Sequence, residues 1–144
     1  MIKVIPYTPA HLKILRLNQG YDPSVLENYG NMDGFLCETI VKDRRGDFEV
    51  LAVLSGALIM AGNFEVSALV GDNAKKYPLE FFRTVKSRIE NYEMKLDLRR
   101  VQCTVRDGFP FLVKFIKMLG FEREGLMRKF GPEGDDYYLY ARVK

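Results

Sequence analysis

The last third of the chain, residues 99–144, constrains the fold most, because its signals predict four elements in a fixed order. Polar and apolar residues alternate over residues 99–106, which is the period of a half-buried strand. A stripe at helical spacing comes next, made of Phe109, Leu112, Phe115, Ile116 and Leu119. Gly120 follows that stripe, at the point where a helix needs a left-handed residue to end. Two further strands, over 121–130 and 135–143, are predicted on either side of a Gly-Pro-Glu-Gly turn.

The N-terminal part of the chain predicts a strand followed by two helices. The strand is expected over residues 2–7, and Thr8 can then cap a helix whose first position is Pro9. This helix is expected to reach about residue 18. Its inward side chains are expected to be Leu12, Ile14 and Leu15. An aspartate–proline pair repeats the start signal and predicts a short second helix over residues 24–29.

Three strands and one long helix are predicted for the middle of the chain, over residues 35–43, 48–61, 64–70 and 78–96. Turn residues separate the strands, and Ser55-Gly56 predicts a bulge or bend within the second one. The third strand is expected in the middle of the sheet, because apolar segments flank it. The long helix is expected to pack on the sheet through Leu79, Phe82, Val85, Ile89 and Tyr92. The predicted order is therefore β-α-α-β-β-β-α-β-α-β-β.

Composition restricts the classes of protein to consider. The chain has 144 residues, 47% of them hydrophobic, which suits a single domain over residues 1–144. A net charge of +3 suits an anionic small molecule but is too weak to predict nucleic-acid binding. The longest nearly apolar run is shorter than a membrane span, and no segment resembles a signal peptide. The two cysteines are far apart and the one histidine, His11, is expected at the surface, so no metal site is predicted and a reducing cytoplasm is favoured.

The order of elements resembles that of the GCN5-related N-acetyltransferase (GNAT) family from end to end. In sequence, the resemblance is carried by Leu119-Gly120-Phe121 after the predicted helix. It implies an α/β protein with the GNAT-like acyl-CoA N-acyltransferase fold around a mixed central sheet. It also implies acetyl-CoA as the cofactor and an amine, on a small molecule or on a protein, as the acceptor of the acetyl group.

The same resemblance implies where acetyl-CoA would bind. In this family the pantetheine arm pairs with the backbone of the fourth strand, and the pyrophosphate lies on backbone amides at the start of the next helix. The corresponding residues here are Ser67, Ala68, Leu69, Val70, Gly71, Lys75, Lys76 and Tyr77. The family's phosphate loop has two glycines, whereas residues 70–79 contain Gly71 alone, and Pro78 lacks a backbone N–H. Lys75 and Lys76 could supply charge to a phosphate, or they could be exposed loop lysines.

Catalysis in this family needs a base for the amine proton and an acid for the departing thiolate. Glu65, on the predicted fourth strand, is the remaining candidate base, and a side chain that faces solvent near the start of that strand is the alternative. The family's acid is a tyrosine whose position falls at Ile116, and an asparagine of the same motif falls at Phe109. Tyr77 is the candidate replacement acid, with a packed aromatic side chain as the alternative.

Three hypotheses for the function are compatible with the sequence. They are an active transferase with an altered phosphate loop, a catalytically silent GNAT-fold protein, and a module that binds coenzyme A or another nucleotide without chemistry. Residues 69–72, 77–82 and 119–121 resemble small GNAT-like proteins encoded by tailed phages. That likeness favours the silent protein and implies a protein partner or virion, with the host cytoplasm or the virion as its location. A homodimer through a sheet edge at the C-terminal strand is a further option.

Overall fold

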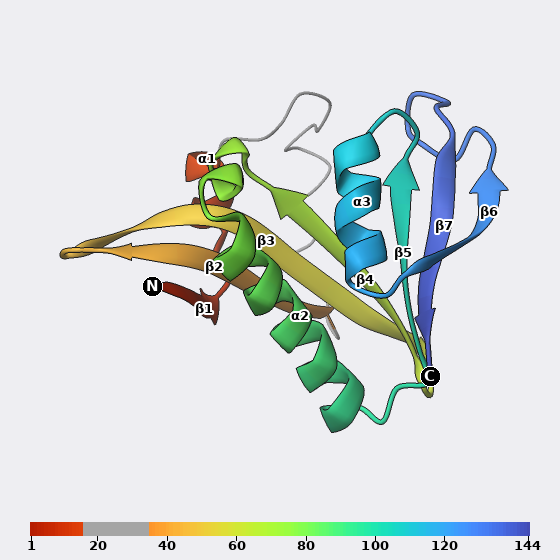
Figure 1. The fold of residues 1–144 in the computed structure, drawn as a ribbon, viewed down its shortest axis with the longest axis horizontal. Coiled ribbons are helices and arrows are strands. Elements are labelled where there is room, and N and C mark those ends of the chain that lie inside the picture. Colours follow the sequence, from red (N-terminus) through yellow and green to blue (C-terminus); the bar gives the residue numbers. More distant parts are fainter. Residues whose placement is uncertain (16–34) are drawn as a thin grey trace. The chain divides into compact units, whose positions relative to one another are not determined.

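The computed structural model of the chain describes residues 1–15 and 35–144 (Figure 1). Its elements are β1 (Ile2–Pro6), α1 (Pro9–Ile14), β2 (Phe35–Arg44), β3 (Asp47–Met60), β4 (Asn63–Val70), the 3₁₀ helix η3 (Asp72–Lys76), α2 (Pro78–Lys95), β5 (Arg100–Arg106), α3 (Pro110–Met118), β6 (Glu122–Met127) and β7 (Tyr137–Val143). α1 ends before the predicted residue 18, because Leu15 is already extended. The helix predicted over residues 24–29 lies outside the described residues.

The seven strands of the described residues form one mixed sheet in the order β1-β2-β3-β4-β5-β7-β6. β1, β2 and β3 pair antiparallel, β4 pairs parallel with β5, and β7 pairs antiparallel with both β5 and β6. The predicted mixed α/β fold is confirmed, and β4 lies in the middle of the sheet as expected. The expectation of a sheet edge at the C-terminal strand is wrong. β7 lies between β5 and β6, so the edge strand at this end of the sheet is β6, and β1 is the edge strand at the other end.

The described residues group into two compact units. Unit 1 lies within Met1–Ala57 and Ser67–Arg88, and unit 2 consists of Leu58–Val66 and Ile89–Lys144. β3, β4 and α2 each belong to both units, because their residue ranges cross these boundaries. The single domain expected for residues 1–144 stays a prediction. Among the described helices, none has the length and apolar character needed to cross a membrane.

The core of unit 1 lies between α1 and one face of the strands. Pro9 begins α1, as the cap-and-proline signal predicts, and both Leu12 and Leu15 are buried. They pack with strand residues, namely Val41, Val50, Val53 and Leu69. Ile14 is 58% exposed, so the expectation that it faces inward is wrong. The short helix presents only one apolar side to the sheet, and Ile14 lies outside it.

His11 is buried, with 7% of its surface exposed, so the expectation of a surface histidine is also wrong. Its Nδ1 accepts a hydrogen bond from the N–H of Thr8 at 3.2 Å and lies 2.7 Å from Oγ1 of Thr39. The rings of Tyr7 and Phe48 meet it edge-on, with centroid distances of 6.2 and 5.7 Å. These polar contacts offset the cost of burying the ring. Thr8 and His11 have the three-residue spacing of a capping box. This sequence signal could have predicted that the side chain of His11 turns back to the N–H of Thr8.

Two other details of unit 1 differ from the sequence expectations. The extra residue in the β2–β3 pairing is Leu51, whereas Ser55-Gly56, the predicted bulge, pairs regularly. On α2, Phe81 is buried and Leu79 is 59% exposed. Two residues cover more than half a helical turn, so these side chains lie on opposite sides of the helix. The buried stripe therefore starts at Phe81 and continues with Val85, while Phe82 is half-buried. In the part of α2 that belongs to unit 2, Ile89 and Tyr92 are buried as predicted.

In unit 2 the predicted end of the helix α3 is confirmed. Gly120 has a φ angle of +91°, which is left-handed. Its N–H donates to the carbonyl of Lys117 at 3.0 Å, and the N–H of Phe121 donates to the carbonyl of Ile116 at 3.1 Å. This pair of bonds is a Schellman motif. Phe121 is buried directly after the motif, which leads the chain into β6.

Candidate functional site

The last residues of β4 are those predicted to bind a pantetheine arm. The parallel pairing of β4 with β5 joins Asn63–Glu65 to Arg100–Gln102, and Ser67 comes after it. Gly71 follows the strand in an extended conformation, and its N–H donates to the carbonyl of Leu51 on β3 at 2.8 Å. The bulge on β3 therefore supplies the acceptor that fixes the end of β4.

The segment after β4, expected as a loop, is the 3₁₀ helix η3. Ala74 is its buried residue, and the N–H of Ala74 donates to the carbonyl of Gly71 at 3.2 Å. The N–H of Tyr77 donates in turn to the carbonyl of Ala74 at 3.1 Å. Lys75 and Lys76, in the last turn of η3, are exposed. The turn thus uses these amides internally and presents both predicted phosphate-binding lysines to solvent.

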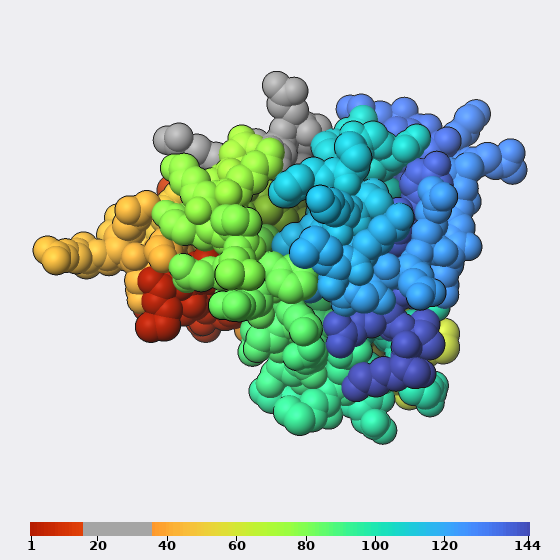
Figure 2. Space-filling model, viewed as in Figure 1, coloured from red at the N-terminus to blue at the C-terminus, as the bar shows by residue number. Residues whose placement is uncertain are grey.

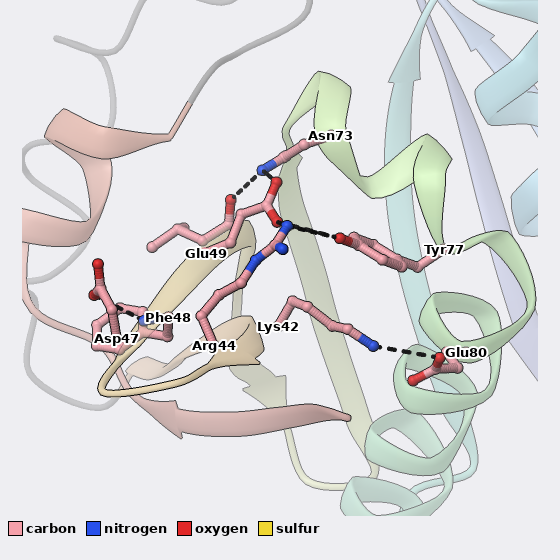
Figure 3. A network of polar contacts seen from close by, with 9 residues as sticks. Lys42, Arg44, Asp47, Phe48, Glu49, Asn73, Tyr77 and Glu80 are labelled. Carbon is pink, nitrogen blue, oxygen red and sulfur yellow. Dashed lines mark hydrogen bonds and ion pairs between the residues drawn. The ribbon is translucent and has the colours of Figure 1, made fainter.

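Glu49 of β3 is the centre of a polar network that joins the β2–β3 hairpin to η3 (Figure 3). Its Oε2 accepts hydrogen bonds from Nη2 of Arg44 at 2.7 Å and from the hydroxyl of Tyr77 at 3.3 Å. Its Oε1 accepts one from Nδ2 of Asn73 at 2.8 Å. Arg44 Nη2 also donates to the Tyr77 hydroxyl at 3.1 Å. Tyr77, the candidate acid, is therefore bound to the hairpin through its hydroxyl.

A second contact joins β2 to the start of α2. Nζ of Lys42 lies 3.6 Å from Oε1 of Glu80 and 4.8 Å from the centre of the Tyr77 ring. Glu80 stands in the first turn of α2, where the helix dipole favours a negative charge. Figure 2 shows the β2–β3 hairpin (orange) beside the start of α2 (green) on this face of unit 1. Hairpin, η3 and helix start are thus held together by charged side chains.

The hydrogen bonds of the network favour the charged forms of Glu49 and Arg44. The bond from Arg44, followed by that from Asn73, lowers the pKa of Glu49, and the bond to Glu49 raises the pKa of Arg44. The side chain of Arg44 is 56% exposed, so solvent screens its attraction to Glu49 and the pair alone contributes little to stability. The hydrogen bonds of Glu49 to Asn73 and Tyr77 are partly buried, so they contribute more to stability than the Arg44–Glu49 pair.

Glu65, the candidate base, is half-buried and falls in unit 2, whereas Tyr77, the candidate acid, falls in unit 1.

The two cysteine thiols are not activated. Burial, followed by the charge of Glu65, raises the pKa of the Cys103 thiol to about 12. Burial also raises the pKa of the Cys37 thiol to about 11. Both thiols are protonated at neutral pH and are poor nucleophiles, so neither is a candidate for covalent catalysis.

The positions where the family has polar catalytic groups are apolar in the structure as in the sequence. Ile116, at the tyrosine position, is buried in unit 2. Phe109, at the asparagine position, is the N-cap of α3, and the guanidinium carbon of Arg106 lies 6.0 Å from its ring centre. In the part of the chain that the structure describes, no group of three His, Cys, Asp or Glu residues is placed to hold a metal ion.

Sequence reasoning missed Arg44, Glu49 and Asn73. The predicted turn between the two strands could have placed Arg44 near Glu49, because residues close to a tight hairpin turn are direct or diagonal cross-strand neighbours, and Glu49 is diagonal to Arg44. No local signal links Glu49 to Asn73 or Tyr77, which follow it by 24 and 28 positions. Only the folded sheet brings these side chains together.

Comparison of the sequence with protein-family models and with curated proteins finds no match. Solved structures do match, and the three described here each match over 99% of this chain. The ribosomal-protein-S18-alanine N-acetyltransferase from Escherichia coli is 14% identical with a TM-score of 0.76, over 94% of its own chain. A chimera of the spermidine N-acetyltransferase SpeG from Vibrio cholerae and hSSAT is 12% identical with a TM-score of 0.73, over 95% of its chain. Ard1 from Thermoplasma volcanium is 11% identical with a TM-score of 0.73, over 97% of its chain.

These identities are so low that the likeness concerns the fold alone. The match covers 99% of this chain and at least 94% of each compared structure, and it agrees with the mixed sheet and its strand order. The chain therefore has the acyl-CoA N-acyltransferase fold of the GCN5-related N-acetyltransferases.

Proposed function

We propose that the chain is an N-acetyltransferase that takes an acetyl group from acetyl-CoA and transfers it to an amine. The observation that carries this proposal is the fold, which matches solved N-acetyltransferases over 99% of the chain. Two of those proteins are named for a protein alanine and for spermidine, which are both amines. The class of acceptor proposed here is accordingly an amine on a small molecule or on a protein.

The end of β4 is the proposed contact for the pantetheine arm. Ser67, Ala68, Leu69 and Val70 follow Glu65, the last β4 residue in the pairing with β5. Their backbone amide and carbonyl groups are proposed to pair with the amides of pantetheine, as an added strand pairs with a sheet edge. The hydrogen bond from Gly71 to Leu51 supports this role, because a strand end that is already fixed loses less entropy on binding.

The residues after Gly71 do not reproduce the family's glycine cradle for pyrophosphate. Tyr77 and Leu79 stand where the glycines are expected, and Pro78 between them has no N–H. Lys75 and Lys76 are therefore the proposed contacts for the negative charge of the cofactor.

Glu65 is the proposed base and Tyr77 the proposed acid. The bound thioester supplies an activated acetyl group, and the amine that receives it must lose a proton. That proton passes to the carboxylate of Glu65, directly or through a water. A proton for the sulfur is proposed to come from the hydroxyl of Tyr77. Because that hydroxyl donates to Glu49 in the structure, this role requires that the hydrogen bond be exchanged during the reaction.

The proposal is tested by following the release of free thiol from acetyl-CoA with a panel of polyamines, amino acids and peptides. We expect release to depend on one class of amine. The variant Glu65→Gln should lower kcat/KM by ~10²-fold, the usual contribution of a general base. Glu122→Gln, which removes one exposed carboxylate from β6, is the matched control and should change neither kcat nor KM. Thiol release that no amine stimulates would overturn the proposal.

A catalytically silent GNAT-fold protein is the second candidate function. It is favoured by the apolar residues Ile116 and Phe109 at the family's polar positions, and by the hydrogen bonds that hold the Tyr77 hydroxyl. In that case the partner is a protein, with phage virion assembly in a host cytoplasm as the specific proposal. A homodimer belongs to the same proposal, with β6 as the exposed strand.

A further inference from the structure

The start of α2 offers few backbone donors to a phosphate. A helix normally presents free N–H groups in its first turn, and anions bind there through them. Here Pro78, the first residue of α2, has no N–H, and Tyr77 before it donates its N–H to the carbonyl of Ala74. The N–H of Phe81 makes the first hydrogen bond of the helix itself, to the carbonyl of Tyr77 at 2.9 Å. Of the N–H groups that a first helical turn leaves for an anion, those of Leu79 and Glu80 remain, which is fewer than a helix start normally offers.

The chain also supplies its own negative charge at this point. Glu80 lies in the first turn of α2, and its Oε1 is 3.6 Å from Nζ of Lys42. A carboxylate there satisfies the helix dipole that a phosphate would otherwise satisfy. Asp72 adds a second carboxylate in the first turn of η3. A phosphate near this turn would therefore meet acidic groups as well as the exposed lysines.

The shape of the turn is held by side chains on both sides. The hydroxyl of Tyr77 is bound by Arg44 and Glu49, and Asn73 donates to Glu49 and to the carbonyl of Val50 at 3.0 Å. Opening the turn into a glycine-type cradle would break these bonds and leave their partly buried partners without them. The turn is therefore committed to its present conformation.

We propose that this protein recognises its donor through the pantetheine arm, and that the nucleotide end of acetyl-CoA adds little affinity. This inference rests on the proposed function. Lys75 and Lys76 are exposed point charges, which attract a phosphate weakly and are screened by salt. The recognised part of the donor is thus its uncharged pantetheine thioester, and S-acetylpantetheine, which lacks the nucleotide, is bound and used nearly as well as acetyl-CoA.

Calorimetric titration of the full chain with both thioesters tests the inference. The two dissociation constants should agree within ~10-fold at ~0.15 M salt and converge as salt is raised, because only screened charges distinguish the ligands. ADP, a fragment of the nucleotide end, should not displace acetyl-CoA. The inference is overturned if acetyl-CoA binds ~100-fold more tightly or more and ADP displaces it, since firm phosphate recognition is then present. That result leaves the proposed function standing.

A charge-removing variant gives an independent check. Glu80→Gln should tighten binding of acetyl-CoA by ~3-fold and leave S-acetylpantetheine unchanged, as expected for one carboxylate several ångströms from a phosphate in water. Glu122→Gln removes the same charge on β6 and should change neither affinity. If Glu80→Gln leaves both affinities as they are, the proposed repulsion is absent and the inference is wrong. If neither thioester binds the native chain, the proposed function itself fails.

Discussion

α1 has two ionisable side chains, of which His11 is buried and Lys13 is exposed. The Nδ1 of His11 accepts from the N–H of Thr8, so the neutral ring carries its proton on the other nitrogen. A charged ring would lose that acceptor and would be poorly solvated. Burial accordingly lowers the pKa of His11 below its usual value of 6.5. The ring is thus a structural group of unit 1 whose state depends on pH.

This environment predicts a pH-dependent stability. The native state binds the proton of His11 less readily than the unfolded state, so the contribution of His11 is full above pH 6.5 and is lost as pH falls through the lower pKa of the folded state. Between pH 7.5 and pH 5.5 (about one unit either side of the free value) the free energy of unfolding should drop by ~1 kcal/mol, the order of one hydrogen bond. Urea unfolding at the two pH values measures it.

The variant His11→Gln keeps a side-chain acceptor but cannot titrate. Its stability should therefore change less between the two pH values than that of the native chain. An equal drop in both proteins would contradict the assignment, because other groups would then carry the pH dependence.

At the scale of the elements, Glu49 links the β2–β3 hairpin to η3. Its carboxylate accepts hydrogen bonds from Arg44, Asn73 and Tyr77. Glu49→Gln replaces one acceptor oxygen by a donor and removes the charge, so we expect a loss of ~1–2 kcal/mol in the free energy of unfolding. Asp47→Asn is the matched control on the same hairpin, since Asp47 accepts only the N–H of Phe48 in the contacts described.

Chemical denaturation of both variants measures this difference. Asp47→Asn should lie within ~0.5 kcal/mol of the native chain, as surface changes usually do. Equal effects of the two substitutions would mean that Glu49 is an ordinary surface carboxylate. The hairpin would then not support the turn that precedes α2.

The ends of elements could be predicted from the sequence where one local rule decides them. Pro9 and Pro78 each begin a helix because proline suits a first helical position. Gly120 ends α3 because only glycine adopts its φ of +91° without strain. In each case the deciding residue lies next to the boundary, so no knowledge of the rest of the fold is needed.

Features that depend on distant residues could not be predicted in this way. His11 is buried because Thr39, 28 positions away, meets its ring. The bulge falls at Leu51 rather than at Ser55-Gly56 because strand pairing, and not glycine content, sets the register. Tyr77 was singled out for its place in the chain, but its hydroxyl partners lie on the hairpin and come from the tertiary fold.

At the scale of the whole molecule, fold and chemistry are separate questions. The strand order and the full-length match to N-acetyltransferases describe a scaffold, and scaffolds of one type carry different functions. The proposed chemistry depends on far fewer groups, namely the end of β4, Glu65 and Tyr77. Whether a donor binds is the property on which every catalytic and specificity proposal here depends.

Calorimetric titration of the full chain with acetyl-CoA tests that property most directly. We predict a dissociation constant on the order of micromolar to tens of micromolar, the range of moderate affinity that a pantetheine arm on a strand end can supply. Replacing both Lys75 and Lys76 by alanine should weaken binding by no more than ~10-fold, since exposed charges contribute little. Absence of binding at millimolar acetyl-CoA, by a chain that circular dichroism shows to be folded, would contradict the account.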